Sequence, residues 1–154
     1  MKLTIISGRS GSGKSTVLHI LEDRGYYRID NLLPSLLPPL VNGISSNTTG
    51  IPNIEVSINA RNMSADLSQV PKIVNGLKHK KILTEFIFLD ASSQTLLNRF
   101  SESRRKHPLS SEKIGLKEAI DIESELLEPI SLMANLSIDT SNMSTLQLLD
   151  ALEN

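Results

Sequence analysis

The sequence contains no cysteine and no tryptophan, and aromatic residues make up only 3% of its 154 residues. Without cysteine the chain can form neither disulfide bonds nor thiolate metal sites, which fits a reducing compartment. Because aromatic side chains are scarce, we expect a core built mainly from leucine, isoleucine and valine. A chain of this length is typical of one domain and is long enough to bury a substantial core.

A long apolar run and an excess of charge are also missing. No apolar run approaches the roughly 20 residues of a membrane-spanning helix, and the run Leu3–Ile6 is too short for a signal peptide. We therefore expect a cytoplasmic domain without a membrane partner. The net charge of -1 argues against electrostatic binding of nucleic acid by the whole domain, although it does not exclude a local basic patch.

Apolar residues recur in two alternating patterns along the chain. Short β-branched or aromatic runs predict strands at 3–6, 26–30, 54–58, 86–89 and 136–139. Helical spacing predicts helices from residue 14 to Gly25, over 65–80, 93–105, 115–134 and 144–152, the second weakened by Pro71 and Gly76. Between these, 45–53 is expected to be a loop, and the prolines at 34, 38 and 39 predict at most a short, broken helix.

This alternation predicts an α/β domain with a parallel five-stranded sheet and helices on both faces. Ligands of such sheets bind at the carboxyl ends of the strands. The residues that fall at those ends are Gly8, Asp30, Asn59 and Asp90.

One motif near the amino terminus points to phosphate chemistry. Residues 8–15, read as Gly8, Arg9, Ser10, Gly11, Ser12, Gly13, Lys14 and Ser15, match the P-loop pattern G-x-x-x-x-G-K-[ST]. The glycines let successive N–H groups turn toward phosphate oxygens, and the helix that follows adds its positive dipole end. Lys14 is expected to reach the β- and γ-phosphates and Ser15 to ligate Mg²⁺. The alternative is a flexible glycine turn without a ligand.

Two carboxylates follow buried strands. Asp90 has the form of a Walker B residue that orients the magnesium shell, or else of a helix N-cap. Asp30 is a candidate base that takes a proton from an acceptor hydroxyl, or holds water on the metal. The alternative for Asp30 is a turn residue of the Asp-Asn type.

Polar and basic residues add further candidates. The segment Asn59, Ala60, Arg61 and Asn62 closes the third predicted strand; its amides cannot act as bases but can hydrogen-bond a base, ribose or phosphate. A cluster at 99–107 contains Arg104 and Arg105. Arg104 is expected to share one helical face with Leu97 and Phe100. Because these two apolar side chains mark that face as inward, Arg104 should point inward and meet an anion. The alternative is a solvated basic helix with a Glu102–Lys106 pair.

Taken together, these motifs resemble the RapZ family of bacterial RNase adapter and nucleotide-binding proteins, also called the YvcJ family. The resemblance rests on SGRSGSGKS at 7–15, GYYRIDNLLPSLLP at 25–38, RRKHPLS at 104–110, ESELLEPI at 123–130 and SIDTS at 137–141. It covers essentially the whole chain. It implies an ATP- and GTP-binding domain with a fold similar to small P-loop kinases, and a second nucleotide segment at 59–62.

The chain departs from the resemblance in two respects. Asn59 stands where members of the family usually have aspartate, which weakens a charge-dependent role there. Members also run to about twice this length, so 1–154 is expected to be the nucleotide-binding domain without the carboxyl-terminal half. The family's RNA binding and sugar-phosphate sensing are attributed to that carboxyl-terminal half. Binding of a small RNA and its presentation to an endoribonuclease, which controls amino-sugar synthesis, would require it.

The sequence therefore predicts a regulatory domain that binds ATP or GTP with Mg²⁺ and hydrolyses the nucleotide slowly at most. In this prediction Lys14 neutralises phosphate charge, Ser15 and Asp90 hold the metal, and Arg104 or Arg105 closes over the phosphates. The alternatives are a small-metabolite kinase that uses Asp30 as base and a structural module with a degenerate cradle. The preferred nucleotide and the formation of a homo-oligomer stay open.

Overall fold

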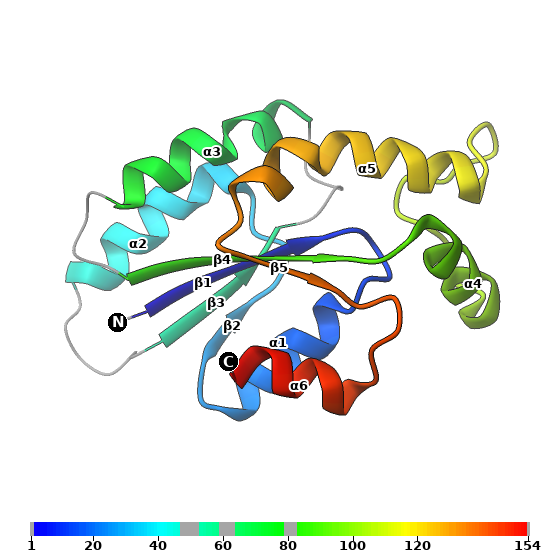
Figure 1. The fold of residues 1–154 in the computed structure, drawn as a ribbon. Helices are drawn as coiled ribbons and strands as arrows, with labels where there is room; N and C mark the ends of the chain where they lie inside the picture. Colours follow the sequence, from blue (N-terminus) through cyan, green and yellow to red (C-terminus); the bar gives the residue numbers. More distant parts are fainter. Residues whose placement is uncertain (1, 47–52, 59–63, 79–82, 154) are drawn as a thin grey trace.

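In the computed structural model the chain folds into three layers, with one sheet between two layers of helices (Figure 1). The structure describes residues 2–46, 53–58, 64–78 and 83–153. The strands are β1 (Lys2–Gly8), β2 (Tyr27–Ile29), β3 (Asn53–Ser57), β4 (Leu83–Asp90) and β5 (Leu136–Asp139). The helices are α1 (Lys14–Asp23), the 3₁₀ turn η1 (Pro34–Leu36), α2 (Leu37–Ser46), α3 (Ser64–Lys78), α4 (Ser93–Ser103), α5 (Leu116–Met133) and α6 (Thr145–Glu153).

The sheet is parallel throughout and has the order β2-β3-β1-β4-β5. β1 lies at its centre, where Ile5 is in register with Val56 on one side and with Phe86 on the other. The predicted α/β fold with a five-stranded parallel sheet and helices on both faces is confirmed. Because all strands run the same way, the segments after β1, β2 and β4 leave the sheet at one edge, and Figure 1 shows α4 beside that edge.

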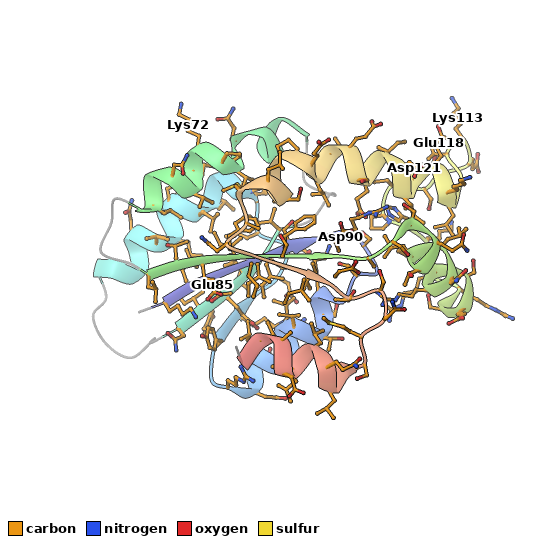
Figure 2. All side chains as sticks on the ribbon, in the orientation of Figure 1. Lys72, Glu85, Asp90, Lys113, Glu118 and Asp121 are labelled. Carbon is orange, nitrogen blue, oxygen red and sulfur yellow. The ribbon has the colours of Figure 1, made fainter. Side chains whose placement is uncertain are left out.

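Two apolar clusters separate the sheet from its helices, and Figure 2 shows the side chains that fill these spaces. One face of the sheet packs on α2, α3 and α5, with Leu3, Ile5 and Phe86 among the buried side chains. The other face packs on α1 and α6 around Ile6 and Leu89. As expected from the composition, the buried side chains are mostly leucine, isoleucine and valine.

The prediction of a short, broken helix around the prolines was wrong. After η1, which begins at Pro34, α2 runs for ten residues with Pro38 and Pro39 in its first turn. Proline is tolerated there because the N–H groups of a first turn have no partner within the helix. α3 likewise continues through Pro71 to Lys78. No helix in the described part of the chain is long and apolar enough to cross a membrane.

Candidate nucleotide site

The P-loop connects β1 to α1 and adopts a backbone that requires glycine. Gly11 has φ 87° and Gly13 has φ 110°, both in the left-handed region. At Gly8 a Cβ atom would lie 2.3 Å from the carbonyl oxygen of Leu89, so the loop passes against β4 more closely than any side chain allows. The loop is therefore a defined cradle, and the alternative of a flexible glycine turn is not what the structure shows.

The positive end of α1 lies in this cradle. Its N-cap residue, Gly13, offers no side chain to the first N–H groups of the helix, which suits an external anion as partner. Lys14 Nζ donates to the carbonyl oxygen of Gly8 at 2.8 Å and so lies over the loop. These features fit the phosphates of a nucleotide.

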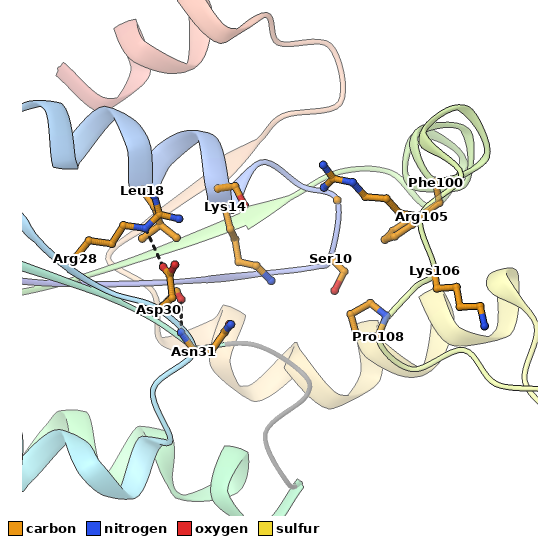
Figure 3. A pocket seen from close by; sticks show the side chains of 13 residues that line it. Ser10, Lys14, Leu18, Arg28, Asp30, Asn31, Phe100, Arg105, Lys106 and Pro108 are labelled. Carbon is orange, nitrogen blue, oxygen red and sulfur yellow. Dashed lines mark hydrogen bonds and ion pairs between the residues drawn. The ribbon is translucent and has the colours of Figure 1, made fainter.

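A cavity of about 260 Å³ opens in front of the loop, here called the P-loop pocket (Figure 3). The P-loop and α1 contribute Ser10, Gly11, Lys14 and Ser15, the end of β2 contributes Arg28, Asp30 and Asn31, and the segment after α4 contributes Arg105, Lys106 and Pro108. The sequence thus correctly placed Asp30 and Arg105 near the loop. In Figure 3 the Arg105 guanidinium extends toward the P-loop, whereas the Lys106 ammonium points away from it.

Asp30 lies both at the pocket and beside a turn. Its carboxylate lines the P-loop pocket, and it precedes a turn in which Asn31 has φ 53°. Arg28 Nε donates to Asp30 Oδ1 at 3.0 Å, and this hydrogen bond is the main reason why the pKa of Arg28 is raised. The carboxylate is thus held by a cation at the side of the pocket. Its function as a base stays a prediction.

Asp90 lies at the end of β4 but does not line the P-loop pocket. Its Oδ1 accepts from the Ala91 N–H at 2.8 Å and lies 3.4 Å from Arg9 Nη1. The N-cap of α4 is Ser92, whose side chain accepts from the Thr95 N–H, so the helix-cap alternative for Asp90 was wrong. Asp90 as a magnesium ligand stays a prediction.

Magnesium would depend on few protein groups here. The described residues contain no group of three His, Cys, Asp or Glu side chains that could hold a metal ion. Among the described residues that line the P-loop pocket, Asp30 is the only carboxylate, and Ser15 is exposed there. The donor set fits an ion held by Ser15, water and phosphate oxygens, which is the usual arrangement for Mg²⁺ beside a P-loop.

Two residues of the motif direct hydrogen-bond donors into the protein rather than into the cradle. Arg9 is buried, and its guanidinium donates to the carbonyl oxygens of Ala91 (3.0 Å) and Ile120 (3.5 Å) and to Ser93 Oγ (2.9 Å). The expectation that the loop N–H groups face phosphate does not hold for Ser10, because its N–H donates to Glu123 Oε1 at 2.6 Å. The side chain of Arg9 and the N–H of Ser10 thus bind the protein itself.

Arg104 does not point inward, and this expectation was wrong. α4 ends at Ser103, and Arg104 follows in the left-handed conformation with an exposed side chain. The helical face that places Leu97 and Phe100 inward therefore stops one residue too early to orient Arg104. Because α4 ends before Lys106, Glu102 and Lys106 do not lie one turn apart on a helix, and the helical spacing expected for this pair is absent.

The predicted second nucleotide segment lies outside the described residues; it consists of Asn59, Ala60, Arg61 and Asn62.

Three residues near the loop have roles that the sequence did not predict. Arg99 donates to the Gly11 carbonyl oxygen at 2.8 Å and to the Thr140 carbonyl oxygen at 2.6 Å, joining α4, the P-loop and the segment after β5. His107 and Glu123 are buried behind the loop. For Glu123 a signal existed, since it shares the spacing of Ile120, Leu127 and Ile130 and so places a carboxylate on the apolar face of α5.

A second hollow of about 230 Å³, here called the β5–α6 hollow, lies on the other side of the loop. Gly11, Gly13 and Thr16 line it from the P-loop side, and Arg99, Thr140 and Ser144 line it from the opposite side. Gly11 lines both cavities. The loop thus separates two hollows that share one residue without a side chain.

The model of the RapZ-like N-terminal domain matches residues 1–154. The chain belongs to this family. The resemblance stated from the motifs is thereby confirmed at the level of the family.

The relatives agree with this membership, and a solved structure agrees with the fold. A nucleotide-binding protein of Hahella chejuensis is 55% identical over 151 residues, which cover 97% of this chain and 53% of the relative. A second, from Marinobacter nauticus, is 49% identical over 155 residues, covering 99% and 53%. The chain thus spans about half the length of these relatives. Shikimate kinase from Acinetobacter baumannii is similar in fold, with a TM-score of 0.62 at 15% identity, covering 99% of this chain and 91% of that one.

Proposed function

We propose that this domain binds ATP or GTP with Mg²⁺ in the P-loop pocket and acts as a nucleotide-responsive regulatory module. The observation that carries the proposal is the cradle itself. At Gly8 the loop packs so closely against β4 that no side chain fits there. The loop also faces the first turn of α1, which has no side-chain cap, and Lys14 lies over it. The relatives, which are named nucleotide-binding proteins, support the same function.

Three residues of the pocket have a definable task in this proposal. The ammonium of Lys14 neutralises phosphate charge, and the hydroxyl of Ser15 contributes to the metal shell, where Mg²⁺ when bound would offset the remaining phosphate charge. Arg105 extends toward the loop and adds a guanidinium, whose fork of donors matches phosphate oxygens. The cationic lining favours a polyanion such as a nucleoside triphosphate.

Slow hydrolysis follows from the one carboxylate available. Fast transfer of a phosphoryl group to water requires a group that orients or deprotonates the nucleophile. Among the described pocket residues Asp30 is the only carboxylate that could deprotonate it, and this carboxylate is engaged by Arg28 at 3.0 Å. We therefore propose a binding module with at most weak ATPase or GTPase activity.

In the whole protein the domain would act within an RNase adapter. We propose that nucleotide binding here modulates the presentation of a small RNA to an endoribonuclease. This presentation would occur through a carboxyl-terminal half such as the longer relatives provide. The near-neutral charge of this chain supports this division of tasks. Residues 1–154 alone should accordingly bind small RNAs weakly and without sequence preference, and tight, selective binding by this chain would contradict the proposal.

The main test is a calorimetric titration of ATP and of GTP, each with Mg²⁺. We expect Lys14→Ala to weaken binding at least about tenfold, because a charge-assisted contact to phosphate is lost. Lys72→Ala, the same change at an exposed position on α3, serves as the control and should bind like the unchanged chain. If neither nucleotide binds, or if Lys14→Ala binds equally well, the proposal fails.

A second candidate is a small-metabolite kinase, favoured by the position of Asp30 opposite Lys14 in one pocket. A kinase would transfer phosphate to an acceptor at about 1–100 s⁻¹. It would lose this transfer in Asp30→Asn while retaining nucleotide affinity. Incubation of the chain with MgATP and small hydroxylated acceptors, followed by detection of a phosphorylated product, distinguishes the kinase from the regulatory module.

A further inference from the structure

A buried polar cluster lies directly behind the P-loop. Glu123 on α5 accepts from the Ser10 N–H and from Ser10 Oγ, both at 2.6 Å. His107 Nε2 lies 3.2 Å from Glu123 Oε1, and the side chains of His107 and Glu123 are both fully buried. Neither residue lines the P-loop pocket. The cluster thus touches the cradle from the side opposite to any ligand.

The hydrogen bonds determine the protonation state of His107. The N–H of Leu109 donates to His107 Nδ1 at 3.1 Å, so Nδ1 presents a lone pair and carries no proton. Nε2 therefore holds the single proton and donates it to Glu123 Oε1. A proton on Nδ1 would face the Leu109 N–H and oppose this arrangement.

Glu123 consequently carries a buried negative charge that three donors stabilise. Burial by itself raises the pKa of the carboxyl group, but hydrogen bonds from His107 and Ser10 outweigh it, and the pKa lies below its usual value. The carboxylate accepts both available donors of Ser10 and so fixes the position of this residue within the loop. The direction of the Arg9–Ser10 peptide, which carries the Ser10 N–H, is set from inside the protein.

The same cluster continues to the segment that closes the pocket. The ring of His107 packs against Phe100 with the centroids 5.1 Å apart, and a Cβ at Gly11 would lie 3.1 Å from Phe100. The contacts therefore form a closed circuit from the P-loop through α5 and the segment after α4 and back to the P-loop. Arg105, which lines the pocket, is two residues from the buried ring of His107.

We propose that Glu123 and His107 are positioning residues for nucleotide binding, acting through Ser10 on the phosphate cradle and through the chain on Arg105. The inference rests on the proposed nucleotide function and adds two residues to it that no ligand touches. It implies that the shape of the cradle, and with it nucleotide affinity, depends on a hydrogen-bonding group at position 123. A purely structural role would instead affect the stability of the fold alone.

The chain offers matched variants that separate these roles. Glu123→Gln keeps an oxygen for the donors and can place its amide group against the Ser10 hydroxyl, so it preserves the hydrogen bonds while removing the charge. Glu123→Ala leaves the Ser10 N–H buried without its partner. Leu127→Ala removes a fully buried side chain one turn further along α5 and lowers stability without removing a hydrogen bond to the loop.

The experiment measures affinity for MgATP and MgGTP by calorimetry and the thermal midpoint of each variant. We expect Glu123→Ala to bind at least about tenfold more weakly than the unchanged chain, and Glu123→Gln and Leu127→Ala to bind within about threefold of it. Equal affinity of Glu123→Ala and the unchanged chain would overturn the inference while leaving the proposed function intact. An equal loss in Leu127→Ala would also overturn it. Failure of the unchanged chain to bind either nucleotide would instead reject the proposed function.

A second measurement judges the cluster without nucleotide and without any variant. Nitrogen-15 NMR of the His107 ring in the unchanged chain at pH 7 should show a proton on Nε2 and none on Nδ1. A doubly protonated ring, or the tautomer with its proton on Nδ1, would contradict the proposed hydrogen bond to Glu123. This measurement keeps the inference testable if Glu123→Ala does not fold.

Discussion

Arg9 Nη1 lies 3.4 Å from Asp90 Oδ1, so a residue of the phosphate-binding motif is paired with the carboxylate that resembles a Walker B aspartate. The pair joins the ends of two adjacent strands, β1 and β4. Asp90 is half exposed, whereas Arg9 is buried. The two partners should therefore contribute unequally to stability.

We expect Arg9→Ala to lower the free energy of unfolding by about 2–3 kcal/mol, because the buried carbonyl oxygens of Ala91 and Ile120 lose their donor. Asp90→Asn should lower it by less than about 1 kcal/mol, as expected for a partly exposed ion pair. Urea denaturation of both variants measures the difference. Equal losses would show that the ion pair, and not the carbonyl contacts, holds Arg9.

Gly8→Ala should destabilise the fold severely, because the added Cβ would approach the Leu89 carbonyl oxygen to 2.3 Å. Gly76→Ala is the matched control. It lies inside α3 with no atom within 4 Å of an added Cβ, and should raise stability by about 0.5–1 kcal/mol. Thermal unfolding followed by circular dichroism compares the two. A well-folded Gly8→Ala protein would mean that the loop is not closed against β4 as described.

Glu55 gives stability a pH dependence near neutrality. Burial raises its pKa from 4.5 to about 7, against an opposing effect of Arg28. Because the folded chain binds this proton more tightly, the stabilisation is complete below about pH 4.5 and is lost as the pH rises through about 7. At about 1.4 kcal/mol per pH unit, the loss approaches roughly 3 kcal/mol.

Replacement Glu55→Gln should abolish this slope, and Glu125→Gln, an exposed change on α5, should retain it. Urea denaturation at a series of pH values between 5 and 8 provides the measurement. If the Glu55→Gln protein shows the same slope as the unchanged chain, then another group titrates in this range and the assignment to Glu55 is wrong.

Two adjacent arginines should differ in their effect on nucleotide affinity. Arg105 lines the P-loop pocket, whereas Arg104 is exposed and does not. We expect Arg105→Ala to weaken MgATP binding about tenfold, and Arg104→Ala to change it by less than about twofold. Calorimetric titration of both variants is sufficient. The reverse order would restore the sequence-based expectation for Arg104.

The sequence predicted the sheet because each strand is a short apolar run, but it did not predict which strands flank β1. Strand order depends on long-range pairing, such as that of Ile5 with Val56 and Phe86, which no local pattern encodes. The helix after Pro34 was missed because a proline pair was interpreted as an interruption, although a first helical turn accepts prolines.

The candidate site was predicted in part for similar reasons. A motif with fixed spacing identified the loop, and the strand ends placed Asp30 correctly at the pocket. The orientation of Arg104 depended on where α4 ends, and a shift of one residue reversed it. The role of Glu123 was not predicted, because Ser10, the partner that explains its burial, lies more than a hundred positions away in the sequence.

The glycine shared by the two hollows sets a minimum length for any ligand that uses both. Gly11 lines the P-loop pocket and the β5–α6 hollow, and such a ligand must pass across it. Arg99 and Thr140 line the β5–α6 hollow and not the P-loop pocket, so a ligand confined to the first cavity would not meet them. On the proposed function, a molecule long enough to cross Gly11 would contact both linings, and one confined to the first cavity would contact only one.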